Sequence, residues 1–199
     1  MLGLLTPSDP AWAKRAAQSL DRVLVDHAHC EMKAASNALA LAARCSPWPR
    51  VVRSLVALAE EELAHFGRVL DELDRRGLAL GPPEEDFYAA ELRRQVAAAR
   101  TKRDLADVVA DRLLVGALIE ARSCERFRLL RDELGATAHE LAPFYDELFA
   151  AEAKHYSDLV ELAALVMGAE APARSRFAQL ATIEAEIVRG LTGTAAIHG

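Results

Sequence analysis

The strongest constraint on this chain is a pattern that occurs twice, a glutamate followed about 30 residues later by a Glu-x-x-His pair. Glu31 precedes Glu62 and His65, and Glu120 precedes the second pair, Glu152 and His155. Residues three apart on a helix lie on one face about one turn apart, so each pair can offer a carboxylate and an imidazole to one ligand. The pattern therefore favours long helices that carry these residues on one side.

The four glutamates and His155 also interrupt apolar stripes. Helical positions seven apart fall nearly on one line, because two turns take about 7.2 residues. The stripes are Leu24–Glu31–Ala38, Leu55–Glu62–Val69, Leu113–Glu120–Phe127–Leu134, Tyr145–Glu152–Leu159–Val166 and Leu148–His155–Leu162. A buried carboxylate is costly unless something compensates its charge. Four such carboxylates with two histidines therefore predict a cation site.

One glutamate from each of two helices, with a Glu-x-x-His pair from each of two others, is the arrangement of di-iron carboxylate bundles. Oxygen and imidazole donors without thiolates suit iron or manganese, and the residues alone leave that choice open. We therefore predict an all-α, ferritin-like four-helix bundle with a crossover helix and an extra C-terminal helix. Its expected metal ligands are Glu31, Glu62, His65, Glu120, Glu152 and His155.

Composition supports an all-helical chain of one domain. Hydrophobic residues make up 52% of the 199 residues and aromatic residues only 6%. Ala, Leu, Arg and Glu, all good helix formers, dominate, and no alternating run of strand length occurs. We expect one domain over residues 1–199, with 190–199 as a frayed tail.

Caps and breakers give the expected helix boundaries. Ser8 or Asp9 can cap the first helix, Gly77 follows the second, and Thr137 to Glu140 reads as a capping box. The expected helices span residues 8–44, 49–76, 84–100, 102–134, 137–167 and 173–189.

Two further residues lie near the expected ligands. His27 stands one turn before Glu31, where it can reach the edge of the site or lie satisfied in the core. Glu125 competes with Glu120, but five positions rotate it about 140° away from the stripe. We prefer Glu120 as the ligand and expect Glu125 either beside the ligands or paired with an arginine.

Charge and cysteine usage restrict the partners and the compartment. The net charge of −6 argues against a large basic surface, and three separated cysteines fit reduced thiols. With no signal peptide or membrane-length apolar run, we expect a cytoplasmic protein without a membrane partner. The basic residues Arg93, Arg94, Arg100, Lys102 and Arg103 are either solvated helix faces or a contact for RNA.

Several longer blocks carry a resemblance to a known family. The most specific are Asp26-His-Ala-His-Cys-Glu31 and Ile119-Glu-Ala-Arg-Ser-Cys-Glu-Arg-Phe127. With the segments 4–12, 61–66 and 144–156, they resemble the tRNA 2-methylthio-N6-isopentenyladenosine hydroxylases through about residue 190.

That resemblance implies a non-haem di-iron monooxygenase that hydroxylates the isopentenyl group of the modified adenosine in tRNA. It implies two iron ions on the six ligands named above, O2 as co-substrate and electrons from a separate reductase or ferredoxin-type donor. The oligomeric state stays open.

Two other functions remain compatible with the ligand pattern. A ferritin-like iron oxidase or peroxidase would turn over Fe(II) or peroxide without any nucleic acid. A purely structural metal site would bind metal tightly and consume no O2. Fold and ligands alone do not choose among these chemistries.

Overall fold

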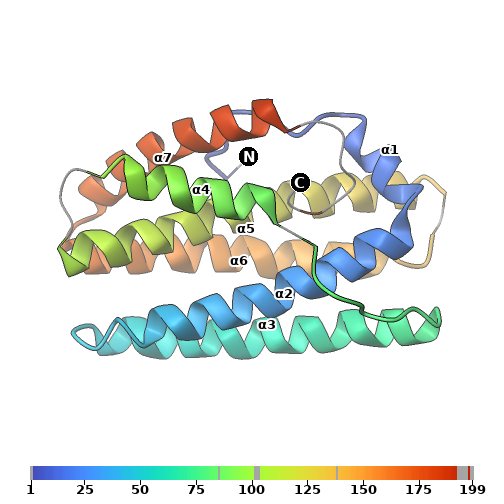
Figure 1. Cartoon of the computed structure of the whole chain (residues 1–199), viewed down its shortest axis with the longest axis horizontal. Helices are drawn as coiled ribbons and strands as arrows, with labels where there is room; N and C mark the ends of the chain where they lie inside the picture. The colour runs from blue at the N-terminus through green and yellow to red at the C-terminus, as the bar shows by residue number, and fades with distance from the viewer. Residues whose placement is uncertain (1, 85, 101–103, 138, 192–196, 198–199) are drawn as a thin grey trace. The chain divides into compact units, whose positions relative to one another are not determined.

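The computed structural model describes residues 2–84, 86–100, 104–137, 139–191 and 197. Within these residues it contains helices and no strand (Figure 1). The helices are α1 (Trp12–Ala17), α2 (Leu20–Ala42), α3 (Pro49–Arg75), α4 (Phe87–Ala98), α5 (Leu105–Gly135), α6 (Ala142–Met167) and α7 (Glu170–Gly190). None of these helices is long and apolar enough to cross a membrane.

The helices fall into two compact units. The larger unit contains α1 and α4 to α7, and the smaller unit contains α2 and α3. One domain over the whole chain stays a prediction.

Helix α5 is the centre of the larger unit. It packs along α6 and also contacts α1, α4 and α7, as Figure 1 shows for the α5–α6 pair. Every residue from Glu120 to Phe127 is buried, so this stretch of α5 is covered all round. The two long helices approach closely at Gly116, where a Cβ atom would stand 3.2 Å from Leu159 Cδ1.

The smaller unit is a pair of packed helices, α2 and α3. Its apolar stripes are buried as expected, with Leu24 and Val69 fully covered and Leu55 1% exposed. Pro49 stands in the first turn of α3, where its missing N–H costs nothing. The helix ends at Arg75, and Gly77 follows with φ +64°, a conformation that favours glycine.

Two aspartates fix the starts of α4 and α5. The carboxylate of Asp86 accepts a hydrogen bond from the backbone N–H of Ala89 (2.9 Å), and Asp104 accepts from Asp107 (2.8 Å). These caps place the starts of both helices three residues later than predicted, since a capping side chain satisfies donors of the first turn.

The single first helix predicted over residues 8–44 is wrong, because the structure has two helices there. The chain leaves helical conformation at Ser19 (φ −131°, ψ 38°). Helix α1 packs on α5, whereas α2 packs on α3, so each helix follows its own partner. Ser8 does not cap a helix either, because its hydroxyl donates to Glu125 (2.7 Å).

The capping box predicted at Thr137 is also wrong. The Thr137 hydroxyl donates back to the carbonyl of Leu134 (3.0 Å), so it closes the end of α5 instead of opening α6. Helix α6 begins at Ala142, with Pro143 in its first turn.

The C-terminal tail departs from expectation at one described residue. Ile197 is fully buried, and its backbone N–H donates to the carboxylate of Asp26 (2.6 Å). Residues 192–196 and 198–199 of the predicted frayed tail lie outside the described residues.

Candidate functional site

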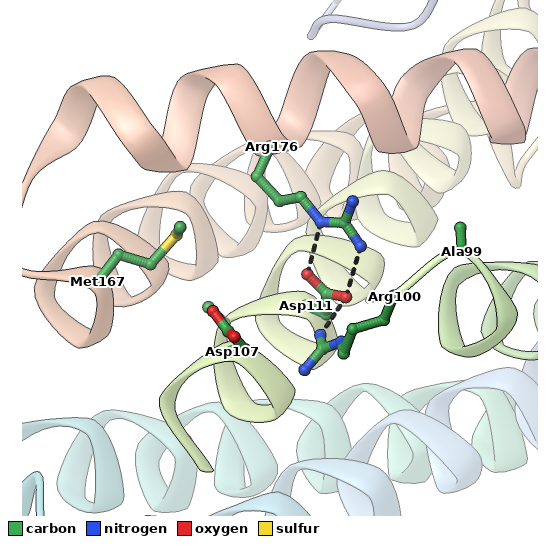
Figure 2. Close-up of a pocket in the computed structure, with 7 residues that line it drawn as sticks. Ala99, Arg100, Asp107, Asp111, Met167 and Arg176 are labelled. Carbon is green, nitrogen blue, oxygen red and sulfur yellow. Dashed lines mark hydrogen bonds and ion pairs between the residues drawn. The ribbon is translucent and has the colours of Figure 1, made fainter. Parts of the chain in front are cut away.

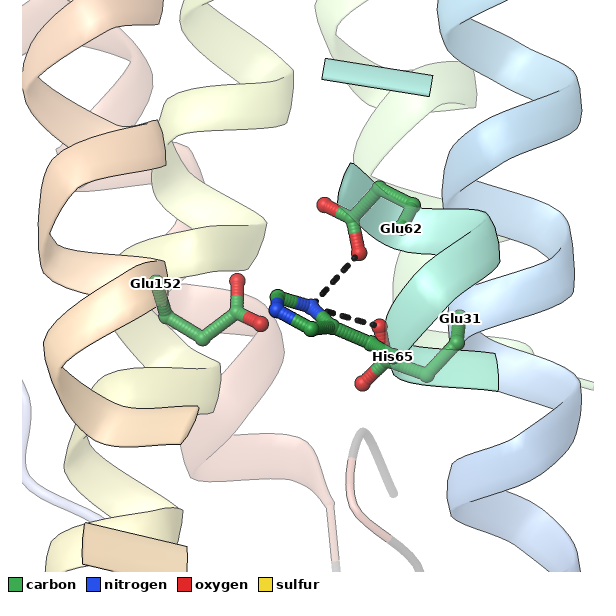
Figure 3. A group of neighbouring side chains, drawn as sticks. All are labelled: Glu31, Glu62, His65 and Glu152. Carbon is green, nitrogen blue, oxygen red and sulfur yellow. Dashed lines mark ion pairs between the residues drawn. The ribbon is translucent and has the colours of Figure 1, made fainter. Parts of the chain in front are cut away.

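The smaller unit brings three of the predicted ligands together. Glu31 comes from α2, and Glu62 and His65 come from α3 (Figure 3). His65 Nδ1 lies 3.6 Å from a carboxylate oxygen of Glu62 and 3.7 Å from one of Glu31. All three can offer ligand atoms within 4.8 Å of one another, which is close enough to share a cation. We call Glu31, Glu62 and His65 the α2–α3 triad.

His27 supports this triad from the same helix as Glu31. Its Nε2 lies 2.6 Å from Glu31 Oε1, and because an ionised carboxylate only accepts, the His27 ring donates this hydrogen bond. The His27 side chain is fully buried, so the bond is shielded from water. The imidazole therefore fixes the direction of the Glu31 carboxylate, as partners of metal-binding side chains commonly do.

The larger unit brings the other three predicted ligands together. Glu120 comes from α5, and Glu152 and His155 come from α6. Their ligand atoms also lie within 4.8 Å of one another, and His155 Nδ1 is 3.4 Å from Glu152 Oε2. We call these residues the α5–α6 triad.

A cysteine lies close to the α5–α6 triad but contributes no thiolate. Burial, together with the negative charge of Glu152, raises the pKa of Cys124 to about 12. Its thiol donates to the carbonyl of Phe149 (3.6 Å). The donors on offer are therefore carboxylate oxygens and imidazole nitrogens.

The residues present fit iron or manganese by their chemistry. All six predicted ligands are buried, with exposed fractions of 8% or less. Buried carboxylates need a compensating charge, and oxygen and imidazole donors without sulfur suit these metals. Each triad can hold a cation between two carboxylates and one histidine.

Glu125 takes the second of the roles expected for it and pairs with an arginine. Its carboxylate accepts from Arg122 and from both the backbone N–H (3.1 Å) and the hydroxyl of Ser8. Arg122 also donates to Glu184 on α7 (2.6 Å), and Tyr88 on α4 donates to the same carboxylate (3.1 Å).

We call Ser8, Tyr88, Arg122, Glu125 and Glu184 the Arg122 cluster. The side chains of Arg122 and Glu184 are fully buried. Burial raises the pKa of Glu184, although Arg122 and Tyr88 favour its charged form. Burial and the Glu184 charge also raise the pKa of Tyr88 well above its usual value. The sequence analysis missed most of this cluster.

The five basic residues expected to contact RNA are in different states. Arg93 and Arg94 are exposed on α4, and Arg94 forms two hydrogen bonds with Glu91 (2.6 and 2.7 Å). Arg100 forms an ion pair with Asp111 and its side chain is only 9% exposed. Lys102 and Arg103 lie outside the described residues.

Arg100 lines a cavity of about 210 Å³ in the larger unit, which Figure 2 shows in close-up. Asp111 stands in the middle, where it also accepts two hydrogen bonds of 2.8 Å from Arg176 on α7. Because two guanidiniums share this one carboxylate, Asp111 links the segment just after α4, which carries Arg100, to α5 and α7. Sequence reasoning missed Arg176, whose partner is 65 residues away.

Comparisons with known proteins give consistent results. The family model described as "tRNA-(MS[2]IO[6]A)-hydroxylase (MiaE)" matches residues 2–199. A Pseudomonas putida protein named tRNA 2-(methylsulfanyl)-N(6)-isopentenyladenosine(37) hydroxylase is 41% identical over 157 residues, which are 79% of this chain and 73% of that protein. The protein of the same name from Salmonella typhimurium is 29% identical, over 92% of this chain and 82% of its own length.

A solved structure shares the fold. "Protein 43 with aldehyde deformylating oxygenase activity from Synechococcus" matches with a TM-score of 0.81 and 33% identity, covering 98% of this chain and 95% of that one. The predicted all-α, ferritin-like fold class is confirmed by this match and by the helices described above.

Proposed function

Because this chain belongs to the family of tRNA-(MS[2]IO[6]A)-hydroxylases, we propose that it hydroxylates the isopentenyl group of 2-methylthio-N6-isopentenyladenosine in tRNA. The observation that carries the proposal is the family match over residues 2–199. Helices that hold carboxylates and histidines in buried triads are consistent with an O2-dependent oxygenation. We place the reaction in the cytoplasm, where tRNA is available.

We propose that the six predicted ligands hold two iron ions. The support is the repeated order of the ligands along the chain and their match to the Glu and Glu-x-x-His template of di-iron bundles. Bound iron would supply the activation of O2, which no side chain of this protein can perform alone.

The protein's own residues hold the ligands and exclude water. His27 directs the Glu31 carboxylate through its short hydrogen bond. On α5 and α6, Leu113, Phe127 and Leu159 are at most 4% exposed and give the α5–α6 triad an apolar surround. Such surroundings suit a prenyl chain, whose transfer from water into an apolar environment is favourable.

Substrate access requires the modified base to leave its stack. Bases in single-stranded loops are splayed out readily and are read by proteins in that state. We therefore propose that an anticodon-loop adenosine enters the site as an unstacked base, while its phosphates stay at the protein surface.

Electrons for the reaction are proposed to come from a separate reductase or ferredoxin-type donor. The sequence contains no Gly-x-Gly-x-x-Gly fingerprint of a dinucleotide-binding domain. One oxygen atom of O2 enters the substrate and the other leaves as water, which consumes two electrons from the donor and two protons from the solvent.

The test is mass analysis of nucleosides from prenylated, methylthiolated tRNA after incubation with iron-loaded, chemically reduced protein and O2. The expected result is a gain of one oxygen on the modified adenosine, lost in Glu62→Ala and kept in Glu60→Ala. Glu60 lies on the same helix but is exposed, so it is a matched control. Iron binding and O2 consumption without oxygen gain on the nucleoside would contradict the proposal.

The same assay separates the competing functions. An aldehyde should be tested as the second substrate, because the solved structure named for aldehyde deformylating oxygenase activity matches 98% of this chain. Turnover of an aldehyde, or of Fe(II) or peroxide alone, without dependence on tRNA would favour an oxygenase, oxidase or peroxidase that needs no nucleic acid.

A further inference from the structure

The arginines on α4 and just after it differ in the charges around them. Arg94 is neutralised by Glu91, whose pKa it lowers to about 2 by hydrogen bonding. Arg100 is bound to Asp111 and largely buried. The Arg94 guanidinium is thus paired on the helix surface, and the Arg100 guanidinium is held against Asp111 away from solution.

Arg93 is in the opposite state. It is exposed on α4, and no carboxylate of the described residues forms an ion pair with it. Neighbouring atoms partly desolvate its guanidinium and lower its pKa, Asp86 opposes this effect, and the positive charge of Arg112 adds to it. The Asp86 carboxylate is itself engaged, because it caps α4 at the N–H of Ala89.

Arg112 is the second member of this arrangement. It lies on α5, which packs against α4, and its side chain is partly exposed. It likewise has no ion pair among the described residues, although Asp111 precedes it in sequence, because Arg100 and Arg176 occupy that carboxylate. Two like charges held near each other repel, so an anion placed between them would relieve an unfavourable interaction.

We infer that Arg93 and Arg112 form a contact for the phosphate backbone of the RNA substrate. The inference rests on the proposed function and deepens it by naming the residues that hold the tRNA. Guanidinium groups match phosphate oxygens with paired hydrogen bonds and remain charged at all physiological pH values. The contact positions the RNA and reads no base.

The position of the pair suits this role. Arg112 precedes Glu120 by eight residues on α5, which corresponds to about 12 Å along the helix axis. That distance is comparable to the length of a nucleotide that carries a prenyl chain. If the arginine pair holds the phosphate of an unstacked nucleotide, the prenyl end of that nucleotide can extend along α5 as far as Glu120.

The experiment measures the salt dependence of tRNA binding by the iron-loaded protein. The double variant Arg93→Gln/Arg112→Gln should bind more weakly, and its plot of log affinity against log salt concentration should be shallower by about 1.4–1.8. This value corresponds to about 0.7–0.9 for each lost phosphate contact. Arg94→Gln removes one charge from the same helix and should leave the slope unchanged, since Glu91 already neutralises Arg94.

A second variant keeps the test decisive if the glutamines disturb folding. Arg93→Lys/Arg112→Lys retains both charges and should restore the slope of the wild-type protein. Equal slopes for the wild type and the double glutamine variant would overturn the inference, as would an equal loss in Arg94→Gln.

Failure of the inference and failure of the proposed function give different results. Wild-type protein that hydroxylates tRNA while the glutamine variant binds with an unchanged slope refutes the phosphate contact alone. Wild-type protein that binds tRNA through Arg93 and Arg112 but adds no oxygen refutes the hydroxylase proposal alone.

Discussion

Individual side chains of the triads differ in how their orientation is fixed. Glu31 accepts a 2.6 Å hydrogen bond from a buried histidine that is not itself a predicted ligand. Groups that hold metal-binding side chains from behind reduce the freedom that metal binding would otherwise have to remove. His27 is therefore expected to control metal affinity without touching the metal.

His27→Leu should weaken iron binding by about 10–100-fold. The leucine fills the buried position with an apolar side chain, and the hydrogen-bond donor to Glu31 is removed. Competition with a chelator of known affinity measures the change. His27→Gln, which can still donate a hydrogen bond, should recover part of the loss, and equal affinities in all three proteins would contradict the role.

At the residue scale, sequence patterns found the ligands but not every buried charge. The criterion of a glutamate on an apolar stripe selects Glu120 and also fits Glu184 on α7, because the positions seven before and seven after it are Phe177 and Leu191. Glu184 is paired with Arg122 across 62 residues. No local pattern distinguishes a carboxylate that meets an arginine from one that meets a metal, because the partner comes from a distant segment.

Between elements, the Arg122 cluster joins four segments of the larger unit. It connects the N-terminal segment at Ser8 with α5, α4 and α7 through buried hydrogen bonds. Removing one partner from a buried network leaves the others uncompensated, which costs far more than removing a surface pair.

Arg122→Met should lower the free energy of unfolding by about 3–5 kcal/mol. Arg131→Met is the matched control, because Arg131 pairs with the exposed carboxylates of Asp132 and Asp146 and should cost at most about 1 kcal/mol. Chemical denaturation of the iron-free proteins measures the free energy of unfolding of both variants. Similar losses would contradict the claim that the Arg122 cluster holds the four segments together.

The close approach of α5 and α6 gives a second prediction at this scale. Gly116→Val should destabilise the protein by about 1–3 kcal/mol, since added methyl groups meet Leu159 in a packed interface. Gly67→Ala on α3 has no neighbour within 4 Å and should stabilise by up to about 1 kcal/mol through helix propensity. Thermal unfolding compares the two, and a stable Gly116→Val variant would show that α5 and α6 can separate.

The helical nature of the chain and the start of α3 at Pro49 could be read from the sequence, whereas the break at Ser19 and the starts of most other helices could not. Asp86 and Asp104 are the residues that cap α4 and α5, yet each lies in a stretch with other capping candidates. Ser8 is a good cap by type, but Glu125, 117 residues away, takes its hydroxyl. Tertiary hydrogen bonds decide between such candidates.

For the whole molecule, buried ionisable groups make stability depend on pH. Burial raises the pKa of Glu184 above its ordinary value of 4.5. Between that value and the raised pKa, the folded state keeps a proton that the unfolded state has lost. The contribution of Glu184 to stability is therefore complete below about pH 4.5 and declines as the pH rises through the folded pKa.

Glu184→Gln removes this titration and keeps the size of the side chain. The free energy of unfolding of the wild type minus that of the variant should fall as the pH rises above about 4.5. Urea denaturation at a series of pH values gives this difference, and a flat or rising difference would contradict the assignment.

The hydrogen bonds between Ser8 and Glu125 have a consequence for synthesis on the ribosome. The two residues are 117 positions apart, so at roughly 5–20 residues per second the partner is made about 6–23 s after Ser8. Through that interval Trp12, which is 2% exposed in the finished protein and lies under Arg126, has no α5 to cover it. Helix α1 is thus the first helix to emerge, yet it can pack only after α5 has been made. During that interval its apolar side chains are accessible to chaperones that bind apolar segments.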